Sequence, residues 1–320
     1  MLIAAAAVLI ATLAATGLVL KFLHRHAIFD HPNKRSSHTG LVPRGGGLAV
    51  VSVLIVAWAV VTAPENRIEV GTVLLAALLL AGVSWIDDLR SLPPWIRLLA
   101  QAAAVLPALV WLGPKGPVFH GLVPGPLDLA LSGLVWLWFI NLFNFMDGID
   151  GITGVETASI GAGIALIASR GLGFGLDPTL AATVSAAAIG FLWWNWHPAK
   201  IFLGDVGSVP LGFLLGWLLL NLASDGYWAA ALILPLYYLA DATITLLRRA
   251  ARRERVWKAH REHFYQHAVQ NGRSHATVSI GVGVCNAALL GLAMLSLAWP
   301  WVALFAAVAV VCVFLFWLSR

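Results

Sequence analysis

The sequence predicts an all-α integral membrane protein with about eleven transmembrane helices. Hydrophobic residues make up 60% of its 320 residues, charged residues make up only 11%, and the mean hydropathy is +0.86. Soluble globular domains usually carry about 25% charged residues. Apolar runs of about 17 to 22 residues, which is long enough to cross a bilayer, also recur along the whole chain. Because these runs leave no room for a soluble domain, residues 1–320 are expected to form a single membrane domain.

The first apolar run decides how the N-terminus is interpreted. It reaches Leu20 without a basic segment before it, and Lys21 and Arg25 follow it. A signal peptide begins with basic residues, so we expect this run to be a retained span. The predicted spans are residues 2–21, 46–63, 70–86, 94–112, 127–143, 153–169, 179–196, 208–223, 228–247, 277–297 and 300–318.

Basic residues are divided unevenly between the two ends of these spans. If successive spans alternate in direction, 17 of the 20 Lys and Arg residues share the face that holds the C-terminus, and Arg67, Lys115 and Arg170 lie opposite. Cytoplasmic loops of membrane proteins carry the excess of Lys and Arg. The N-terminus is therefore expected outside and the C-terminus in the cytoplasm. Nine of the ten histidines fall on the same face, which the charge rule does not require.

An aspartate pair ends the third span, in the stretch "SWIDDLRSLPPW". Asp87 and Asp88 stand at the mouth of the span, and ionisable residues at membrane depth are functional candidates. Adjacent carboxylates can bind a divalent cation or act as a base. A solvated turn at a helix end is the alternative interpretation of an isolated pair.

The stretch "NLFNFMDGIDGI" follows the fifth span and concentrates polar groups. Asp147 and Asp150 are three residues apart, which is about one helical turn. Asn141 and Asn144 lie upstream with the same spacing, where their amides can bind a ligand or orient the acids. A simple loop at the membrane surface would not need four such groups, because each desolvated carboxylate is costly.

The stretch "GDVGS" opens the eighth span. A helix start favours an anion such as phosphate, and Asp205 can bind a hard cation. A helix cap is the alternative interpretation of this short pattern.

Two basic loops complete the same face. The first offers Lys34, Arg35, His38 and Arg44, and the second, residues 248–275, is a basic loop that includes His260 and His263. Such groups suit charge-assisted contacts with phosphate. A zinc site and a solvated amphipathic segment remain alternatives for the histidines, and membrane topology alone can explain the arginines.

These features together favour phosphoryl transfer on a lipid substrate, since acids can hold a metal while basic groups neutralise phosphate oxygens. A transporter or lipid flippase is the alternative from another class. Transporters place polar groups near the bilayer midplane, often in repeated halves. Here the middles of the spans are almost free of charge, with Asp241 as the main exception, and no repeat is found. A noncatalytic lipid-binding protein is a third alternative, and nothing indicates nucleic-acid binding.

The motifs "DHPNKRSSH", "PRGGG", "DD", "NLFNFMDGIDG", "NWHPAKIFLGDVGS" and "HREHFYQH" occur in this order between residues 30 and 267. Together they resemble the polyprenyl-phosphate N-acetylhexosamine-1-phosphate transferases, a glycosyltransferase family 4 type. The resemblance implies a transfer that depends on Mg²⁺, with Mn²⁺ as a possible substitute. A UDP-N-acetylamino sugar would give its sugar-1-phosphate to undecaprenyl phosphate and leave UMP.

The resemblance also implies roles for individual residues. Asp205 corresponds to the expected magnesium ligand, Asp87 and Asp88 correspond to the pair that handles the lipid phosphate, and Asp147 belongs to the catalytic element. A second set is expected to bind substrate through amide, carboxylate, aromatic or basic groups. Its members are Asn144, Asp150, Asn195, Phe202, His260, His263, Lys34, Arg35 and His38.

The subfamily is suggested by the second basic loop. The peptidoglycan branch usually shows consecutive histidines there, whereas this chain has "HREHFY", which looks more like the enzymes that initiate O-antigen synthesis. Peptidoglycan and teichoic acid precursors remain alternatives within the family. The resemblance further implies a bacterial inner membrane location and a possible homodimer.

Overall fold

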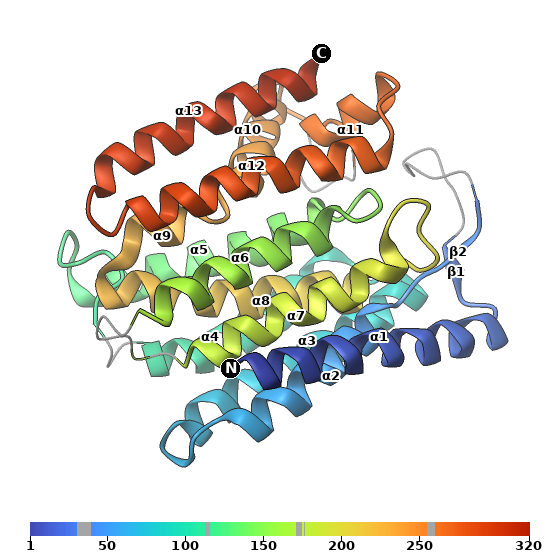
Figure 1. The fold of residues 1–320 in the computed structure, drawn as a ribbon, viewed down its shortest axis with the longest axis horizontal. Coiled ribbons are helices and arrows are strands. Elements are labelled where there is room, and N and C mark those ends of the chain that lie inside the picture. Colours follow the sequence, from blue (N-terminus) through green and yellow to red (C-terminus); the bar gives the residue numbers. More distant parts are fainter. Residues whose placement is uncertain (31–39, 113–115, 171–174, 176, 255–259) are drawn as a thin grey trace.

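The computed structural model describes the whole chain except residues 31–39, 113–115, 171–174, 176 and 255–259. Long helices lie side by side and form a single bundle (Figure 1). Within the described residues, the β-structure is confined to one short hairpin and an isolated bridge. The predicted all-α class is therefore confirmed.

The described residues form thirteen α-helices, and each lies in an apolar run or in a segment between two runs. They are α1 (Leu2–Arg25), α2 (Gly47–Val61), α3 (Arg67–Arg90), α4 (Pro94–Leu112), α5 (Gly125–Phe145), α6 (Ile152–Ala168), α7 (Pro178–Asn195), α8 (Asp205–Leu222), α9 (Trp228–Ile233), α10 (Leu236–Ala251), α11 (Phe264–Gln270), α12 (His275–Leu295) and the last helix α13 (Pro300–Ser319). Short helical turns η1 (Pro64–Asn66) and η3 (Ala223–Tyr227) join some of them.

Ten of the eleven predicted spans correspond to one helix each, but the ninth prediction was wrong in detail. Residues 228–247 form two helices, α9 and α10, which are separated at Leu234 and Pro235. Proline lacks a backbone N–H, and its ring clashes with the preceding turn of a helix, so it interrupts the run. The basic loop predicted at 248–275 is also shorter than expected, because α10 extends to Ala251 and α11 lies within it.

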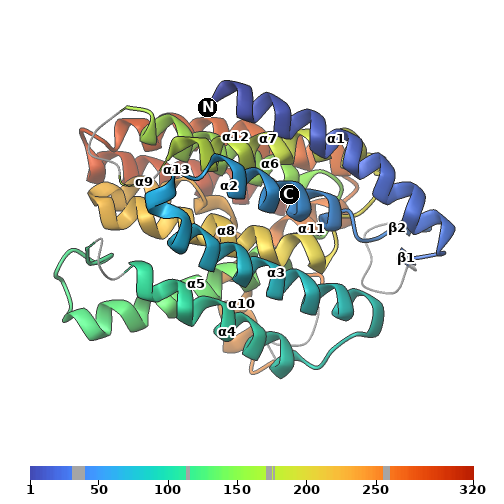
Figure 2. The same cartoon turned by 90° about the horizontal axis from the view of Figure 1, so that it is seen from below.

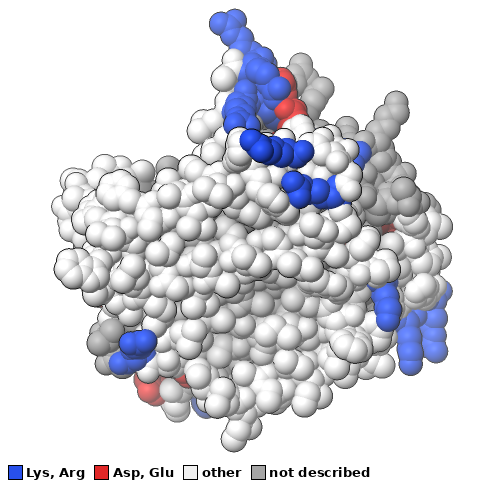
Figure 3. Space-filling model, turned by 45° about the horizontal axis from the view of Figure 1, so that its top comes forward, with Lys and Arg blue, Asp and Glu red and all other residues white. Residues whose placement is uncertain are grey.

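The helices have the length and surface of a membrane protein. Six of the described helical segments are long and apolar enough to cross a bilayer. Large hydrophobic side chains such as Val60, Leu106, Trp193 and Phe305 are exposed on the outside of the bundle. On the face shown in Figure 3, Lys and Arg gather near the margins, and the broad surface between them is almost free of charge. The chain is thus an integral membrane protein, while eleven crossings stay a prediction.

Helix α8 lies in the middle of the bundle (Figure 2) and carries one of the predicted motifs at its start. Every residue of α8 after Asp205 is buried. Trp136 of α5 stacks on Phe213 with ring centroids 4.8 Å apart, and its indole N–H donates to the Phe213 carbonyl at 2.9 Å. A Cβ on Gly47 would collide with the backbone of Gly207, so the starts of α2 and α8 meet closely. This packing fixes where Asp205 stands.

A small hairpin supports the same end of the bundle. Strand β1 (Phe29–Asp30) pairs antiparallel with β2 (Val42–Pro43) beyond the end of α1. The Phe202 amide donates to the Pro43 carbonyl at 2.8 Å, and the Gly46 amide donates to the Phe202 carbonyl at 2.8 Å. The hairpin, the loop before α8 and α11 therefore lie at one end of the molecule, which is on the right in Figure 1. This end is called the site end below.

Candidate active site

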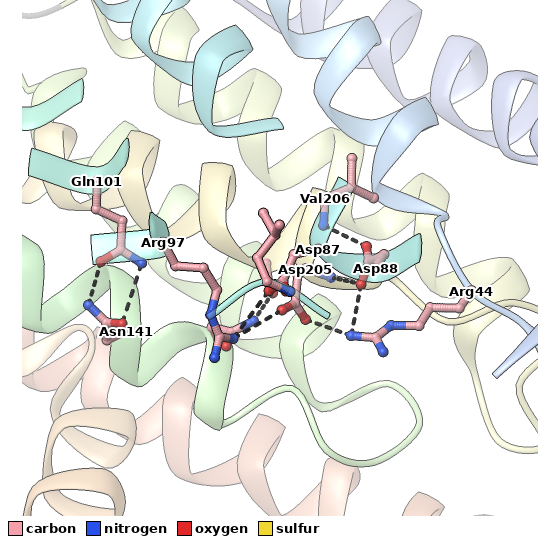
Figure 4. Close-up of polar contacts among 11 residues, drawn as sticks. Arg44, Asp87, Asp88, Arg97, Gln101, Asn141, Asp205 and Val206 are labelled. Carbon is pink, nitrogen blue, oxygen red and sulfur yellow. Dashed lines mark hydrogen bonds and ion pairs between the residues drawn. The ribbon is translucent and has the colours of Figure 1, made fainter. Parts of the chain in front are cut away.

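Three carboxylates and two guanidinium groups meet at the site end (Figure 4). One nitrogen of Arg44 lies 2.8 Å from Oδ1 of Asp88 and 2.7 Å from Oδ1 of Asp205. One nitrogen of Arg97 lies 3.2 Å from Oδ2 of Asp87 and 3.9 Å from Oδ2 of Asp205. The residues come from α3, α4, the start of α8 and the segment after β2. The predicted aspartate pair and the predicted metal ligand are therefore brought together.

The three carboxylates differ in how the backbone holds them. Asp88 accepts hydrogen bonds from the amides of Asp205 and Val206, at 3.1 and 3.0 Å, and so caps the start of α8. Asp87 accepts from the Leu92 amide at 2.5 Å, which closes the turn after α3. A Cβ on Gly204, which has φ +74°, would approach Asp88 to 2.8 Å. Asp88 is thus an anchor, whereas Asp205 is partly exposed and faces the arginines.

The donor set of this cluster fits a hard divalent cation. Asp87, Asp88 and Asp205 offer carboxylate oxygens, which are the ligands that Mg²⁺ prefers. Burial disfavours the charge of Arg44, but Asp205 and Asp88 outweigh it and raise its pKa, so the guanidinium stays charged. The two arginines balance the carboxylates and can also receive phosphate oxygens.

A second cluster surrounds Asp150 and uses histidines in place of arginines. Nδ1 of His197 lies 2.6 Å from Oδ2 of Asp150, and Nδ1 of His275 lies 3.3 Å from its Oδ1. The Ala199 amide also donates to Asp150, at 3.2 Å. Burial opposes ionisation of Asp150, but hydrogen bonds from His275 and His197 outweigh it and lower the pKa of the carboxyl. Asp150 is therefore held as a charged acceptor.

The Asp150 cluster has ligand types that metals such as zinc use. One atom from each of Asp150, His197 and His275 lies within 4.8 Å of the others. In the structure each imidazole contacts the carboxylate directly, with His197 at 2.6 Å and His275 at 3.3 Å from Asp150. Sequence reasoning did not find His275, because it lies 125 positions after Asp150 and at the start of another helix.

The segment between α5 and α6, residues 146–151, is called the acid loop below. The Asn144 amide, just before it, donates to the hydroxyl of Ser208 on α8 at 2.9 Å. Burial raises the pKa of Asp147 to about 6, the charge of Asp205 adds to this, and a hydrogen bond from Thr153 opposes it. The acid loop is thus electrostatically coupled to the carboxylates at the start of α8.

Two predicted asparagines mainly join parts of the fold. Asn195 accepts from the Gly151 amide at 2.9 Å and donates to the Ile201 carbonyl at 2.9 Å, so it ties the acid loop to the loop before α8. Asn141, expected to bind a ligand or orient the acids, instead pairs with Gln101 of α4, with the shorter contact 2.7 Å (Figure 4).

The histidine segment, residues 260–270, contains two predicted substrate contacts. The rings of His260 and His263 lie 4.9 Å apart, and His263 is buried. Burial, followed by the charges of His263 and Arg249, lowers the pKa of His260 to about 4, so its imidazole is neutral at pH 7. The Tyr265 hydroxyl donates to the Phe145 carbonyl at 3.1 Å, which joins this segment to the start of the acid loop.

Of the remaining predicted substrate residues, the structure describes only Phe202. Phe202 forms a backbone bridge beside Arg44, at the edge of the carboxylate cluster. Lys34, Arg35 and His38 lie outside the described residues.

Comparison with known proteins identifies the family of the chain. The family model described as glycosyl transferase family 4 matches residues 70–223, which include both clusters of carboxylates. A phospho-N-acetylmuramoyl-pentapeptide-transferase of Deinococcus radiodurans is 30% identical over 251 residues, covering 72% of this chain and 77% of the relative. The chain belongs to glycosyltransferase family 4. It is a transferase, so the transporter and flippase interpretation is set aside.

Other relatives of this family 4 transferase carry two kinds of name. A probable undecaprenyl-phosphate N-acetylglucosaminyl 1-phosphate transferase of Bacillus subtilis is 27% identical over 278 residues, covering 83% of this chain and 76% of the relative. A phospho-N-acetylmuramoyl-pentapeptide-transferase of a Synechococcus strain is 32% identical over 230 residues, covering 64% of this chain and 60% of the relative. The histidine segment and α12 lie beyond the part that the family model matches.

Proposed function

We propose that this protein transfers an N-acetylamino-sugar 1-phosphate from a UDP-sugar to undecaprenyl phosphate at the cytoplasmic face of a bacterial inner membrane. The products are a polyprenyl-diphosphate sugar and UMP. The observation that carries the proposal is the meeting of Asp87, Asp88 and Asp205 with Arg44 and Arg97 at the mouth of apolar helices. The names of the relatives, which describe sugar-phosphate transfer, support it.

The reaction exchanges one phosphoanhydride bond for another. An oxygen of the acceptor phosphate attacks the β-phosphorus of the UDP-sugar, and the bond from that phosphorus to the bridging oxygen breaks. UMP leaves with the electron pair. Such transfers need mainly positioning and neutralisation of charge on phosphate oxygens.

The two arginines are suited to neutralise this charge. The side chain of Arg44 is 33% exposed and that of Arg97 is 39% exposed. A ligand can therefore reach both guanidinium groups while they stay paired with the carboxylates. Arginine binds phosphate through two parallel hydrogen bonds. Asp87, beside Arg97 at the end of α3, would position the acceptor phosphate or take its proton.

The three carboxylates would hold Mg²⁺ or Mn²⁺, with Asp205 as the main ligand. When bound, the ion would supply positive charge to the diphosphate oxygens. The charged carboxylate of Asp150 can accept hydrogen bonds from the nucleotide. The resemblance to the family assigns Asn144, Asn195 and Phe202 to substrate binding as well. His260 and His263 are assigned to the diphosphate.

The sugar is best sought first among simple UDP-N-acetylamino sugars. The Bacillus subtilis relative is named for N-acetylglucosaminyl transfer, and the segment "HREHFY" departs from the run of histidines expected in the peptidoglycan branch. Initiation of O-antigen synthesis is the pathway that we propose. The muramyl-pentapeptide donor is the second candidate, because several relatives carry that name.

An assay of the purified protein tests the proposal. Undecaprenyl phosphate and Mg²⁺ are supplied with a panel of UDP-sugars that includes UDP-N-acetylglucosamine and UDP-N-acetylmuramoyl-pentapeptide. Release of UMP and formation of the lipid product with one donor, both lost on addition of EDTA, are expected. Folded protein that turns over none of these donors contradicts the proposal.

A second assay separates direct attack from a two-step route. Labelled UMP is incubated with the UDP-sugar and enzyme in the absence of polyprenyl phosphate. Direct attack predicts no exchange of label, whereas a covalent phospho-enzyme intermediate would place label in the UDP-sugar.

A further inference from the structure

Asp241 of α10 is a fully buried carboxylate that the proposed reaction does not use. It accepts hydrogen bonds from the Phe264 amide at 3.0 Å and from the Tyr265 amide at 3.2 Å. Its Oδ1 also lies 3.1 Å from Nδ1 of His263. These three contacts fall on consecutive residues, so one side chain holds both the backbone and the imidazole of the histidine segment.

The contacts offset the cost of burying the carboxylate. A buried ionised group is strongly destabilising unless hydrogen bonds satisfy it. Asp241 meets this need with the two amides and His263, and the hydroxyls of Tyr237 and Thr245 lie 3.4 Å away. Both oxygens of Asp241 act as acceptors, one for the Phe264 amide and one for the Tyr265 amide. A carboxamide would replace one oxygen by an N–H₂ group, which cannot accept a hydrogen bond from either amide.

Tyr265 carries the link onward to the acid loop. Its hydroxyl donates to the Phe145 carbonyl at 3.1 Å, one residue before the acid loop. A Cβ on Gly148 would collide with the same hydroxyl, so the two segments are in close contact. Asp241 therefore fixes the start of α11, and α11 in turn lies against the loop that holds Asp147.

We propose that Asp241 is a positioning residue that holds the histidine segment against the acid loop. It sets where His260 and His263 stand relative to Asp147, although it touches no substrate itself. This inference rests on the proposed function for its kinetic consequence, but the contacts themselves can be tested without turnover.

The chain offers a matched control at the opposite end of the bundle. Asp128 of α5 is also buried and accepts from two consecutive amides, those of Val118 at 3.0 Å and Phe119 at 2.8 Å. Asp241→Asn and Asp128→Asn remove the same charge and the same kind of contact. Only the first substitution weakens the proposed link to the site.

Hydrogen exchange of the full-length protein in lipid nanodiscs tests the link directly. In Asp241→Asn we expect exchange to rise about tenfold or more in peptides covering residues 260–270 and 145–151, because the local opening free energy falls. Asp128→Asn should leave both peptides at the wild-type rate. Wild-type protection of residues 260–270 in Asp241→Asn would overturn the proposal, whatever the activity.

Steady-state kinetics of the same two variants provide a second test of the role of Asp241. Asp241→Asn is expected to lower kcat about tenfold or more, with KM for the UDP-sugar changed less than about threefold, since misplaced groups act mainly on the chemical step. Asp128→Asn should keep both constants. An unchanged kcat in Asp241→Asn would contradict the inference. Absence of turnover in the wild type would refute the proposed function instead, and hydrogen exchange would still decide the role of Asp241.

A second variant keeps the test valid if Asp241→Asn does not fold. Tyr265→Phe removes only the hydroxyl that reaches the Phe145 carbonyl. We expect faster exchange in residues 145–151, with residues 260–264 unchanged. Equal protection of residues 145–151 in this variant and the wild type would overturn the link between the two segments.

Discussion

The two ends of the helical bundle use buried aspartates in the same way but surround them differently. At the opposite end, Asp128 accepts from the Val118 and Phe119 amides and so fixes a loop. At the site end, Asp88 does the same for two amides at the start of α8, but it also pairs with Arg44. Capping the backbone needs only the carboxylate. The added guanidinium is beyond what the fold requires.

Other carboxylates at the site end also have charged or ionisable partners in addition to backbone contacts. Asp87 and Asp205 face Arg97, and Asp150 faces two imidazoles, with all the partners coming from other elements of the chain. Desolvated ion pairs often cost more than they contribute to stability. Their concentration at one end therefore indicates a site for a charged ligand, whereas the opposite end serves stability. Substitutions at the two ends should separate these roles.

The largest effect is expected for Asp205→Asn. Loss of this charge removes the proposed metal ligand and a partner of both arginines, so kcat should fall about a thousandfold or more. The melting temperature should change by only a few degrees, because the side chain is partly exposed. Turnover assays and thermal unfolding in detergent measure the two quantities. Activity within tenfold of the wild type would remove Asp205 from the mechanism.

A smaller effect is expected for Arg44→Lys. One guanidinium nitrogen bridges Asp88 and Asp205, and a lysine ammonium that kept this bridge would have no second nitrogen with which to bind a phosphate through two parallel hydrogen bonds. The value of kcat/KM should fall about 10- to 100-fold. Arg67→Lys, at the opposite end, is the control and should behave as wild type. Equal kcat/KM in the two variants would mean that Arg44 contributes only charge.

Asp147→Asn should separate stability from activity. The pKa of Asp147 is about 6 against an ordinary value of 3.8, so the folded protein holds the proton more tightly than the unfolded chain. The stability from this proton is complete below the unfolded pKa and is lost as the pH rises through the folded pKa. Above that range the charged carboxylate destabilises the protein by up to about 3 kcal/mol.

The asparagine variant carries no such proton. Its melting temperature minus that of the wild type should therefore grow between pH 4 and pH 6 and then stay level, while its activity is lost. Thermal unfolding across pH 4 to 8 measures the difference. A difference that is flat with pH would show that Asp147 has an ordinary pKa.

The smallest effect on activity is expected for Asp128→Asn. Turnover should stay within about twofold of the wild type, because the residue serves only the opposite end. The free energy of unfolding should fall by about 1 to 3 kcal/mol as a charged hydrogen-bond acceptor is lost. A tenfold loss of turnover would mean that the two ends are coupled and would break the comparison.

Most helices could be predicted from the sequence because crossing a bilayer requires an apolar run of fixed minimum length. The break in the ninth predicted span was missed, since its apolar character continues through Pro235 and only the backbone constraint of proline interrupts it. The segment that contains α11 was predicted as a loop because its helix has only seven residues and gains stability from contacts with Asp241 and α13.

The candidate site was predicted in part for a similar reason. Asp87, Asp88, Asp147 and Asp205 stand at helix ends in short local patterns, which a sequence displays directly. Of their partners, Arg44 was predicted as a phosphate contact, but its pairing with the acids was not. Arg97 carried only a topology signal, and the contact between Asp150 and His275 spans 125 positions.

The sequence by itself determined the membrane class, most helix positions and the set of acidic motifs, because hydropathy and local spacing are properties of neighbouring residues. Only the tertiary structure decided which charges meet. It made Asp88 the cap of α8, gave Asp150 its histidines and placed Asp241 under the histidine segment. The physical reason is that hydrogen bonds and ion pairs act over a few ångströms, and helix packing alone brings such distant residues within that range.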